Sequence, residues 1–282
     1  MIGSRATFAS EAATELRKVP AFLRRDLLVT LSYRAAFLAD WFSLLIQMVT
    51  FSYVARLVDP DVLPTIDGTQ VSYLQFVAVG IAVTSFLQIA LGRVVTTIRG
   101  EQLMGTLEAL LLTPTAKVTL QLGIVAYDLI YVPLRTTLFL TGAALLFDVD
   151  LQVSGLFPFV AVLVAFIPFV WGLGVAAGAS VLAFRRGNAA TGFLAVALSL
   201  TSGAYFPLEL LPGWAQALAR WNPALVALDA SREAMLGTAG WSDIAGPVAS
   251  LLLMAVVSLT VGFGAFSLAL RHERRRGTLG LY

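Results

Sequence analysis

The chain has 282 residues, of which 58% are hydrophobic and only 13% are charged, with 19 Lys and Arg against 17 Asp and Glu. A soluble domain of this length carries about 25% charged residues, so the composition excludes an ordinary soluble protein. The apolar residues come in blocks close to the length of a bilayer span, which predicts an all-α integral membrane protein. Cysteine is absent and His272 is the only histidine, which excludes disulfides, thiol nucleophiles, multi-histidine metal sites and histidine-based triads.

Residues 8–33 form a charged amphipathic stretch in which apolar residues recur at helical spacing and basic residues lie between them. Such a helix lies in the membrane interface rather than crossing it. Pro20 is expected to kink or split this helix. The alternative is a solvated helix outside the membrane.

Six transmembrane helices are predicted after this segment. We expect them at 35–58, 72–95, 118–147, 153–184, 188–204 and 244–270. Pro158 and Pro168 are expected to interrupt the fourth.

Residues 205–237 are interpreted separately because their apolar pieces, of about 10–14 residues, are too short to cross a hydrocarbon core of about 30 Å. Asn222 and Pro223 are typical of a helix start, and Gly237 of a helix end. The pattern predicts a re-entrant pair of short helices. The residues of interest there are Phe206, Pro207, Glu209, Pro212, Asn222, Pro223 and Arg232. The alternative is a seventh, poorly hydrophobic span.

The distribution of charge favours six spans. Most Lys and Arg residues lie in 1–34, 93–117, 185–187 and 271–282, whereas the intervening loops are mainly acidic. The positive-inside rule then places both termini in the cytoplasm. A seventh span would move the basic segment 271–282 outside, against that rule.

Several polar side chains fall within the predicted spans. A charge at the centre of a span costs at least about 2.5–3.5 kcal/mol, so it is a functional hypothesis by default. Asp128 and Arg135 lie on one face of the third span and can pair with each other or with another helix; substrate contact and a structural pair both stay open. Gln47 and Gln88 are candidates either for a substrate path or for hydrogen bonds between helices.

The segment 99–114, between the second and third spans, predicts a short amphipathic helix on the cytoplasmic side. Its leucines and methionine form one face, its acidic and polar residues lie off that face, and Pro114 ends it. Such a helix can present a face to a soluble partner or can be a simple interfacial connector.

Here the chain resembles a known family. Residues 101–114, with their Gly105-Thr106-Leu107-Glu108 core and Leu-Thr-Pro ending, resemble the coupling segment of ABC-2 type transporter permeases, and residues 206–237 resemble that family's second signature. The resemblance implies an exporter-like fold in which 8–33 is a connecting helix and 205–237 lies at the extracellular exit. The coupling residues it implies are Glu101, Gly105, Thr106, Leu107, Glu108, Thr113 and Pro114.

The same resemblance implies partners and a location. Two permease chains, expected to be identical, would dock two ATPase subunits in a bacterial cell membrane. The substrate would be a drug, a natural product or a lipid, with lipid-linked polysaccharide as the alternative.

The chain has no glycine-rich phosphate loop, and its only lysines, Lys18 and Lys117, follow no such turn. We therefore expect ATP and Mg²⁺ to bind to a partner chain, and no catalytic residue, cofactor or metal on this one. An ion-coupled secondary transporter is the competing class, although such proteins usually show internal repeats or several intramembrane carboxylates.

Overall fold

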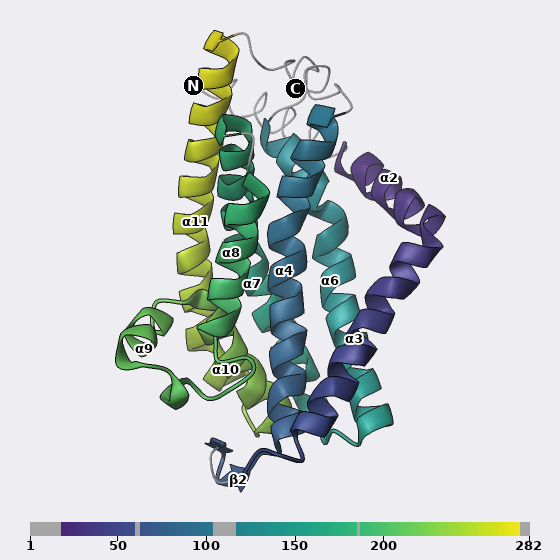
Figure 1. Ribbon diagram of the computed structural model, residues 1–282, viewed down its shortest axis with the longest axis vertical. Coiled ribbons are helices and arrows are strands. Elements are labelled where there is room, and N and C mark those ends of the chain that lie inside the picture. The colour runs from purple at the N-terminus through teal and green to yellow at the C-terminus, as the bar shows by residue number, and fades with distance from the viewer. Residues whose placement is uncertain (1–17, 60–62, 104–116, 185–186, 277–282) are drawn as a thin grey trace, which may run out of the picture.

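The computed structural model describes residues 18–59, 63–103, 117–184 and 187–276. These residues are almost entirely helical, which confirms the all-α prediction (Figure 1). The helices are α2 (Val19–Ser32), α3 (Arg34–Val54), α4 (Tyr73–Leu103), α6 (Lys117–Phe147), α7 (Leu156–Phe184), α8 (Gly187–Leu200), α9 (Gly213–Ala219), α10 (Pro223–Leu236) and α11 (Trp241–Arg276). Two 3-10 turns, η2 (Val153–Gly155) and η3 (Leu208–Leu210), and a hairpin of β1 (Thr65–Ile66) and β2 (Thr69–Gln70) complete the described chain.

Among the described residues, four helices are long and apolar enough to cross a membrane: α4, α6, α7 and α11. Two further helices carry shorter apolar stretches, Leu38–Val54 in α3 and Thr191–Leu200 in α8. At 1.5 Å per residue, the 14 residues of α8 extend about 21 Å, less than the roughly 30 Å of a bilayer core.

Helix α4 is the centre of the bundle (Figure 1). Its apolar window is 71% buried, against 28% for that of α11. Phe86 of α4 stacks on Phe166 of α7 with ring centroids 5.6 Å apart. At Gly80 the backbone of Ala204 approaches so closely that a Cβ atom would overlap its carbonyl group.

The structure corrects the expectation that prolines interrupt the fourth span, since α7 runs unbroken from Leu156 to Phe184. Pro158 lies in the first turn, where a backbone N–H has no intrahelical partner and its absence is harmless. Pro168 lies inside the helix, which continues through it. Helix α11 packs along α7, where Ser258 Oγ donates a 2.8 Å hydrogen bond to the Phe169 carbonyl and Gly172 meets Gly262.

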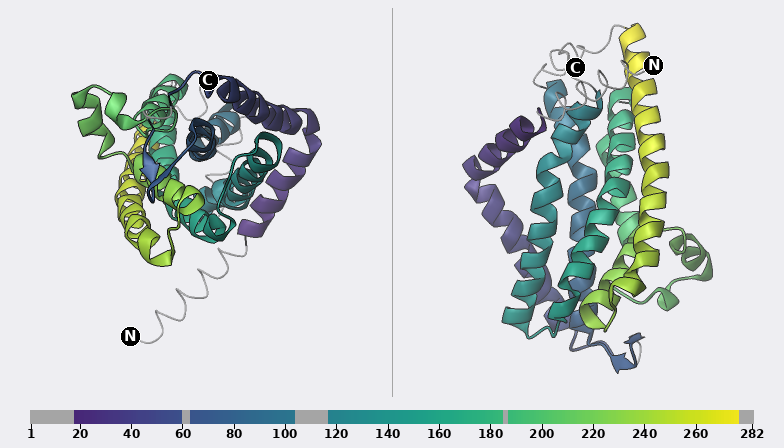
Figure 2. Two further views of the ribbon diagram at one scale, coloured as in Figure 1. Left: turned by 90° about the horizontal axis from the view of Figure 1, so that it is seen from below. Right: turned by 180° about the vertical axis from the view of Figure 1, so that it is seen from behind.

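Pro20 lies in the first turn of α2, where its missing backbone N–H is harmless. The part of the expected interface helix before Lys18 lies outside the described residues. The chain bends at Tyr33 between α2 and α3. Helix α2 packs on α6, with the Phe22 ring against Gly123, and α3 diverges from α4 towards the end where α2 lies (Figures 1 and 2).

A tight hairpin lies at the opposite end of the bundle from α2 (Figure 1). Asp67 and Gly68 form its turn with positive φ angles of 50° and 74°. Asp67 Oδ2 accepts hydrogen bonds from the backbone N–H of Thr238, at 2.6 Å, and from its hydroxyl, at 2.8 Å. These two bonds, the backbone one first, hold the pKa of Asp67 below its ordinary value.

Candidate functional site

A chain of ion pairs joins three helices at the end of the bundle where α2 lies. Asp26 of α2 is buried and accepts a 2.8 Å hydrogen bond from Arg93 Nη2 of α4 and a 2.9 Å bond from Arg25 Nε. Arg93 Nε also lies 3.4 Å from Oδ2 of the buried Asp128 on α6. Arg93 therefore bridges two buried carboxylates, and through them it connects α2, α4 and α6.

A second ion pair fixes α3 to α6. Arg135 is only 3% exposed and donates from Nε and Nη2 to the two carboxylate oxygens of Asp40, at 2.7 and 2.8 Å. This two-point geometry is the strong form of the arginine–carboxylate contact. Asp128 and Arg135 thus pair with other helices rather than with each other, which favours the structural interpretation over substrate contact.

Sequence analysis missed both Asp26 and Arg93. In the sequence, Arg93 lies among the basic residues at the end of a predicted span, and Asp26 lies in the predicted interface helix. The available signal was that Asp26 is the only acidic residue among the basic residues of 17–34. A single acidic residue in such a basic segment is expected to pair with a basic residue on another helix.

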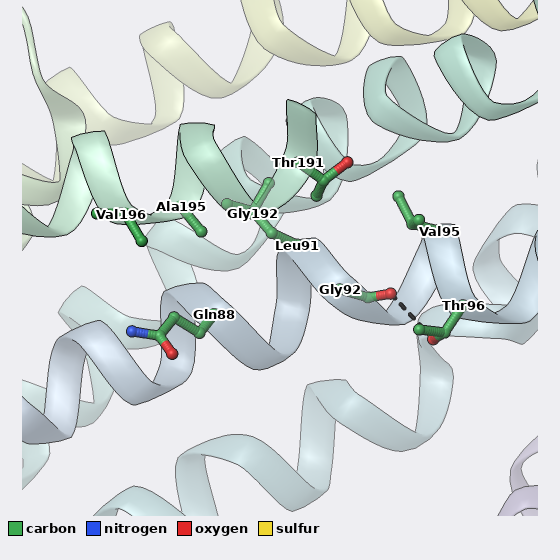
Figure 3. A pocket seen from close by; sticks show the side chains of 9 residues that line it. All are labelled: Gln88, Leu91, Gly92, Val95, Thr96, Thr191, Gly192, Ala195 and Val196. Atoms are coloured by element: carbon green, nitrogen blue, oxygen red, sulfur yellow. Dashed lines mark hydrogen bonds between the residues drawn. The ribbon is translucent and has the colours of Figure 1, made fainter. Parts of the chain in front are cut away.

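A cavity of about 380 Å³ opens between α4 and α8 (Figure 3). Gln88, predicted on the substrate path, is part of the lining, and its side chain is exposed. Apolar and small residues form most of the wall, and Gly192 leaves open space where a side chain would stand. The lining consists of Gln88, Leu91, Gly92, Val95, Thr96, Thr191, Gly192, Ala195 and Val196. Gln47, the other predicted path residue, is half-buried on α3 and does not line this cavity.

Arg232 of α10 and Asn222, the N-cap residue of that helix, hold the end of α8 and the turn that follows it. The buried Arg232 donates from Nη2 to the carbonyls of Gly203, at 2.8 Å, and of Ala204 and Phe76, both at 3.3 Å. Its guanidinium carbon lies 3.5 Å from the centre of the Phe76 ring, close enough for a cation–π contact. We refer to Asn222 and Arg232 together as the α8–α10 clamp.

Asn222 has two functions in this clamp. Its Oδ1 accepts a 2.9 Å hydrogen bond from the backbone N–H of Ala224 and so caps α10. Its Nδ2 donates to the Leu198 carbonyl and to Thr201 Oγ1, at 2.8 and 2.9 Å. The helix start that the sequence predicts at Asn222 and Pro223 is therefore also a contact with α8.

The two short helices of the predicted re-entrant region have different environments. Helix α10 is mostly buried within the bundle, whereas α9 projects from its side (Figure 1). Trp214 and Trp221, at the two ends of α9, are 71% and 82% exposed. Among the other predicted exit residues, Phe206 is half-buried, Pro207 and Pro223 are buried, and Glu209 and Pro212 are exposed.

The predicted coupling segment is only partly described. Helix α4 continues without a break to Leu103, so the expected separate helix does not begin at 99. The stretch from Val95 to Leu103 contains no proline, and the single Gly100 weakens a helix by only about 1 kcal/mol. Glu101 lies in the last turn of α4, while Gly105, Thr106, Leu107, Glu108, Thr113 and Pro114 lie outside the described residues.

Long apolar helices, with ion-paired charges buried between them, define a polytopic α-helical membrane protein. In the described ranges no group of three His, Asp or Glu residues could hold a metal ion. The family model of the ABC-2 type transporter matches residues 17–236, from the start of α2 to the end of α10. The chain therefore belongs to the ABC-2 type transporter family, as the sequence motifs predicted. No curated protein matches the chain.

Proposed function

We propose that this chain is the permease subunit of an ATP-driven exporter that moves a hydrophobic or amphipathic compound out of the cytoplasm or the inner leaflet. Membership of the ABC-2 family supports a permease that works with an ATPase on another chain. The observation that carries the proposal is the continuity of α4. This one helix lines the cavity, carries Arg93 of the ion-pair chain and reaches Leu103, within the predicted coupling segment 99–114.

The proposed topology has six spans with both termini in the cytoplasm. Helix α2, the end of α4 and the end of α11 lie at one end of the bundle (Figure 1). Basic residues belong to these elements, while the hairpin end carries acidic ones. The positive-inside rule supports a cytoplasmic location for the first end. The basic residues are Arg24, Arg25, Arg93, Arg99, Arg271 and Arg275; the acidic ones are Asp67, Asp148, Asp150 and Asp243.

In the proposed mechanism, the partner ATPases close on ATP and displace segment 99–114. Because α4 is helical up to Leu103, that displacement acts directly on α4. Arg93 transmits the movement to α2 through Asp26 and to α6 through Asp128. Two such chains, in a homodimer, would alternate between inward and outward access.

The α4–α8 cavity supports the proposed substrate class. Its volume of about 380 Å³ falls within the range of small-molecule sites, about 300–1,000 Å³. Its wall is mainly apolar, with the polar groups of Gln88, Thr96 and Thr191 on it. Such a wall suits an amphipathic drug, natural product or lipid better than a highly hydroxylated polysaccharide, since few polar groups could replace lost water.

The test is reconstitution with a partner ATPase subunit of the ABC type. We expect the two chains to copurify and substrate to stimulate ATP hydrolysis in proteoliposomes. Glu101→Ala with Glu108→Ala should abolish that stimulation, whereas Asp150→Ala, an exposed acid at the opposite end, should not. Transport driven by a proton or sodium gradient without ATP would instead establish the ion-coupled class, and uptake restricted to lipid-linked glycans would establish the polysaccharide alternative.

A further inference from the structure

A groove of about 520 Å³ lies between α7 and α11, away from the cavity and the ion pairs. Its residues follow helical spacing on both walls, so each helix contributes one continuous face. Most of them are alanines, and the short side chains create the depth of the groove. The lining consists of Ala176, Ala179 and Ser180 from α7 and Ala265, Leu268, Ala269 and His272 from α11.

The groove opens towards the surroundings of the bundle rather than into its core. Leu268 on its wall is 67% exposed. Large side chains behind the groove, including Phe266 and Leu270, fill the contact between the two helices. The apolar window of α11 is only 28% buried, as expected for a helix that borders lipid.

The cytoplasmic end of the groove coincides with the end of the apolar part of α11. The candidate span in this helix ends at His272, which is itself a lining residue. Arg271 precedes His272 and Arg275 follows it, both with exposed side chains. Because residues i and i+3 share a helix face, His272 and Arg275 lie on the same side.

We propose that this groove binds an anionic phospholipid of the cytoplasmic leaflet, with one acyl chain between the alanines and the phosphate beside His272 and Arg275. The apolar groove matches the chain, and the basic mouth lies where a headgroup would lie. Basic pockets between membrane helices on the cytoplasmic side are a general type of anionic-lipid site. The proposal uses the topology proposed above but neither the exported substrate nor the ATPase.

The experiment is lipid titration of the purified, delipidated permease, alone or in complex with its ATPase, read by native mass spectrometry. Dioleoyl phosphatidylglycerol is the probe, and dioleoyl phosphatidylcholine and soluble glycerol phosphate are the comparison arms. We expect one phosphatidylglycerol per permease chain to stay bound under conditions that remove phosphatidylcholine, and glycerol phosphate not to compete.

Two variants separate the acyl-chain contact from the headgroup contact. Ala269→Leu should fill the groove and weaken binding of both lipids, whereas Ala249→Leu, at an exposed alanine near the other end of α11, should not. His272→Gln with Arg275→Gln should remove the preference for phosphatidylglycerol, with a loss of about fivefold for the arginine charge. The matched control for charge is Arg220→Gln, exposed near α9.

Several outcomes would overturn the proposal. Equal retention of the two lipids would refute a headgroup site, and displacement by glycerol phosphate would indicate a simple anion site. If Ala269→Leu dissociates the complex, the groove is a protein interface. Unchanged phosphatidylglycerol binding in a folded Ala269→Leu variant would exclude the groove altogether. If the proposed substrate is wrong or the ATPase is inactive, these lipid-binding readouts do not change. Failure of the proposed function can therefore be distinguished from failure of the lipid site.

Discussion

Arg135 on α6 holds the carboxylate of Asp40 on α3 by two hydrogen bonds, of 2.7 and 2.8 Å. The partners are unequal, because the Arg135 side chain is 3% exposed and that of Asp40 is 38% exposed. Removing the acid leaves a buried guanidinium without its counterion, whereas removing the arginine leaves an acid that is partly exposed. Because of this asymmetry, substitution of Asp40 and substitution of Arg135 should have different effects on stability.

Asp40→Ala should therefore destabilise the protein more than Arg135→Met does. We predict a loss of about 3 kcal/mol for Asp40→Ala, the low end for a broken buried pair because Asp40 is partly exposed. The double variant should recover much of that loss. Equilibrium unfolding in detergent measures the cycle, and purely additive effects of the two substitutions would contradict the pairing.

Arg93→Gln should uncouple α2 from the bundle. It removes the only contact that joins the buried carboxylates of Asp26 and Asp128 among the ion pairs of the described residues. We expect faster hydrogen exchange in α2 and a loss of transport larger than the loss of basal ATP hydrolysis. Arg34→Gln, at an exposed arginine at the start of α3, is the matched control. Unchanged exchange in α2 would show that its packing on α6, at Phe22 and Gly123, is sufficient.

Arg232→Lys should weaken the α8–α10 clamp although the charge is retained. A lysine ammonium group cannot reproduce the planar guanidinium over the Phe76 ring together with the bonds to the three carbonyls. Each hydrogen bond to a charged group contributes about 1.5–3 kcal/mol, so we predict a loss of at least about 1.5 kcal/mol in unfolding free energy. Arg220→Lys, on the exposed side, should be neutral.

The contact of Asp67 with Thr238 should depend on pH. Its pKa lies below the ordinary 3.8 in the folded protein, so the carboxylate favours the docked hairpin fully above that value. The contribution is lost as pH falls through the lower, folded pKa. A spin label at Thr65→Cys, in a chain with no natural cysteine, should become more mobile below about pH 4. With Asp67→Asn added, the label should show no such change with pH.

Gly192→Leu should block the α4–α8 cavity without unfolding the protein. An added Cβ at Gly192 meets nothing within 4 Å, so the new side chain enters the cavity space instead of the core. We expect substrate-stimulated ATP hydrolysis to fall several-fold while unfolding free energy changes by less than about 1 kcal/mol. Gly142→Leu on α6, where an added Cβ is equally unobstructed, is the control. Normal stimulation in Gly192→Leu would exclude this cavity from the substrate path.

Helix positions were largely predictable because long apolar blocks and cap residues are local signals. Asn222 followed by Pro223 marks the start of α10 within a few residues of sequence, and the structure places α10 there. The partners of the buried charges were not predictable, because they depend on which helices are neighbours. Asp128 and Arg135 share a helix face, yet their counterions lie on α4 and α3. The expectation that Pro158 interrupts the fourth span failed because this residue falls in the first turn of α7, a position set by where the helix begins.

The closeness of Gly80 to Ala204 has a consequence for how the protein can move. At Gly155 the backbone of Ala234 is similarly close, and Gln152 N–H donates a 2.8 Å hydrogen bond to the Met235 carbonyl. Backbones in such contact have no side chains that could change rotamer to let them slide past one another. The hairpin end of α4, the end of α8, α10 and the start of α7 therefore form one rigid block. Any opening on that side must separate this block from α3, from α9 or from a second copy of the chain.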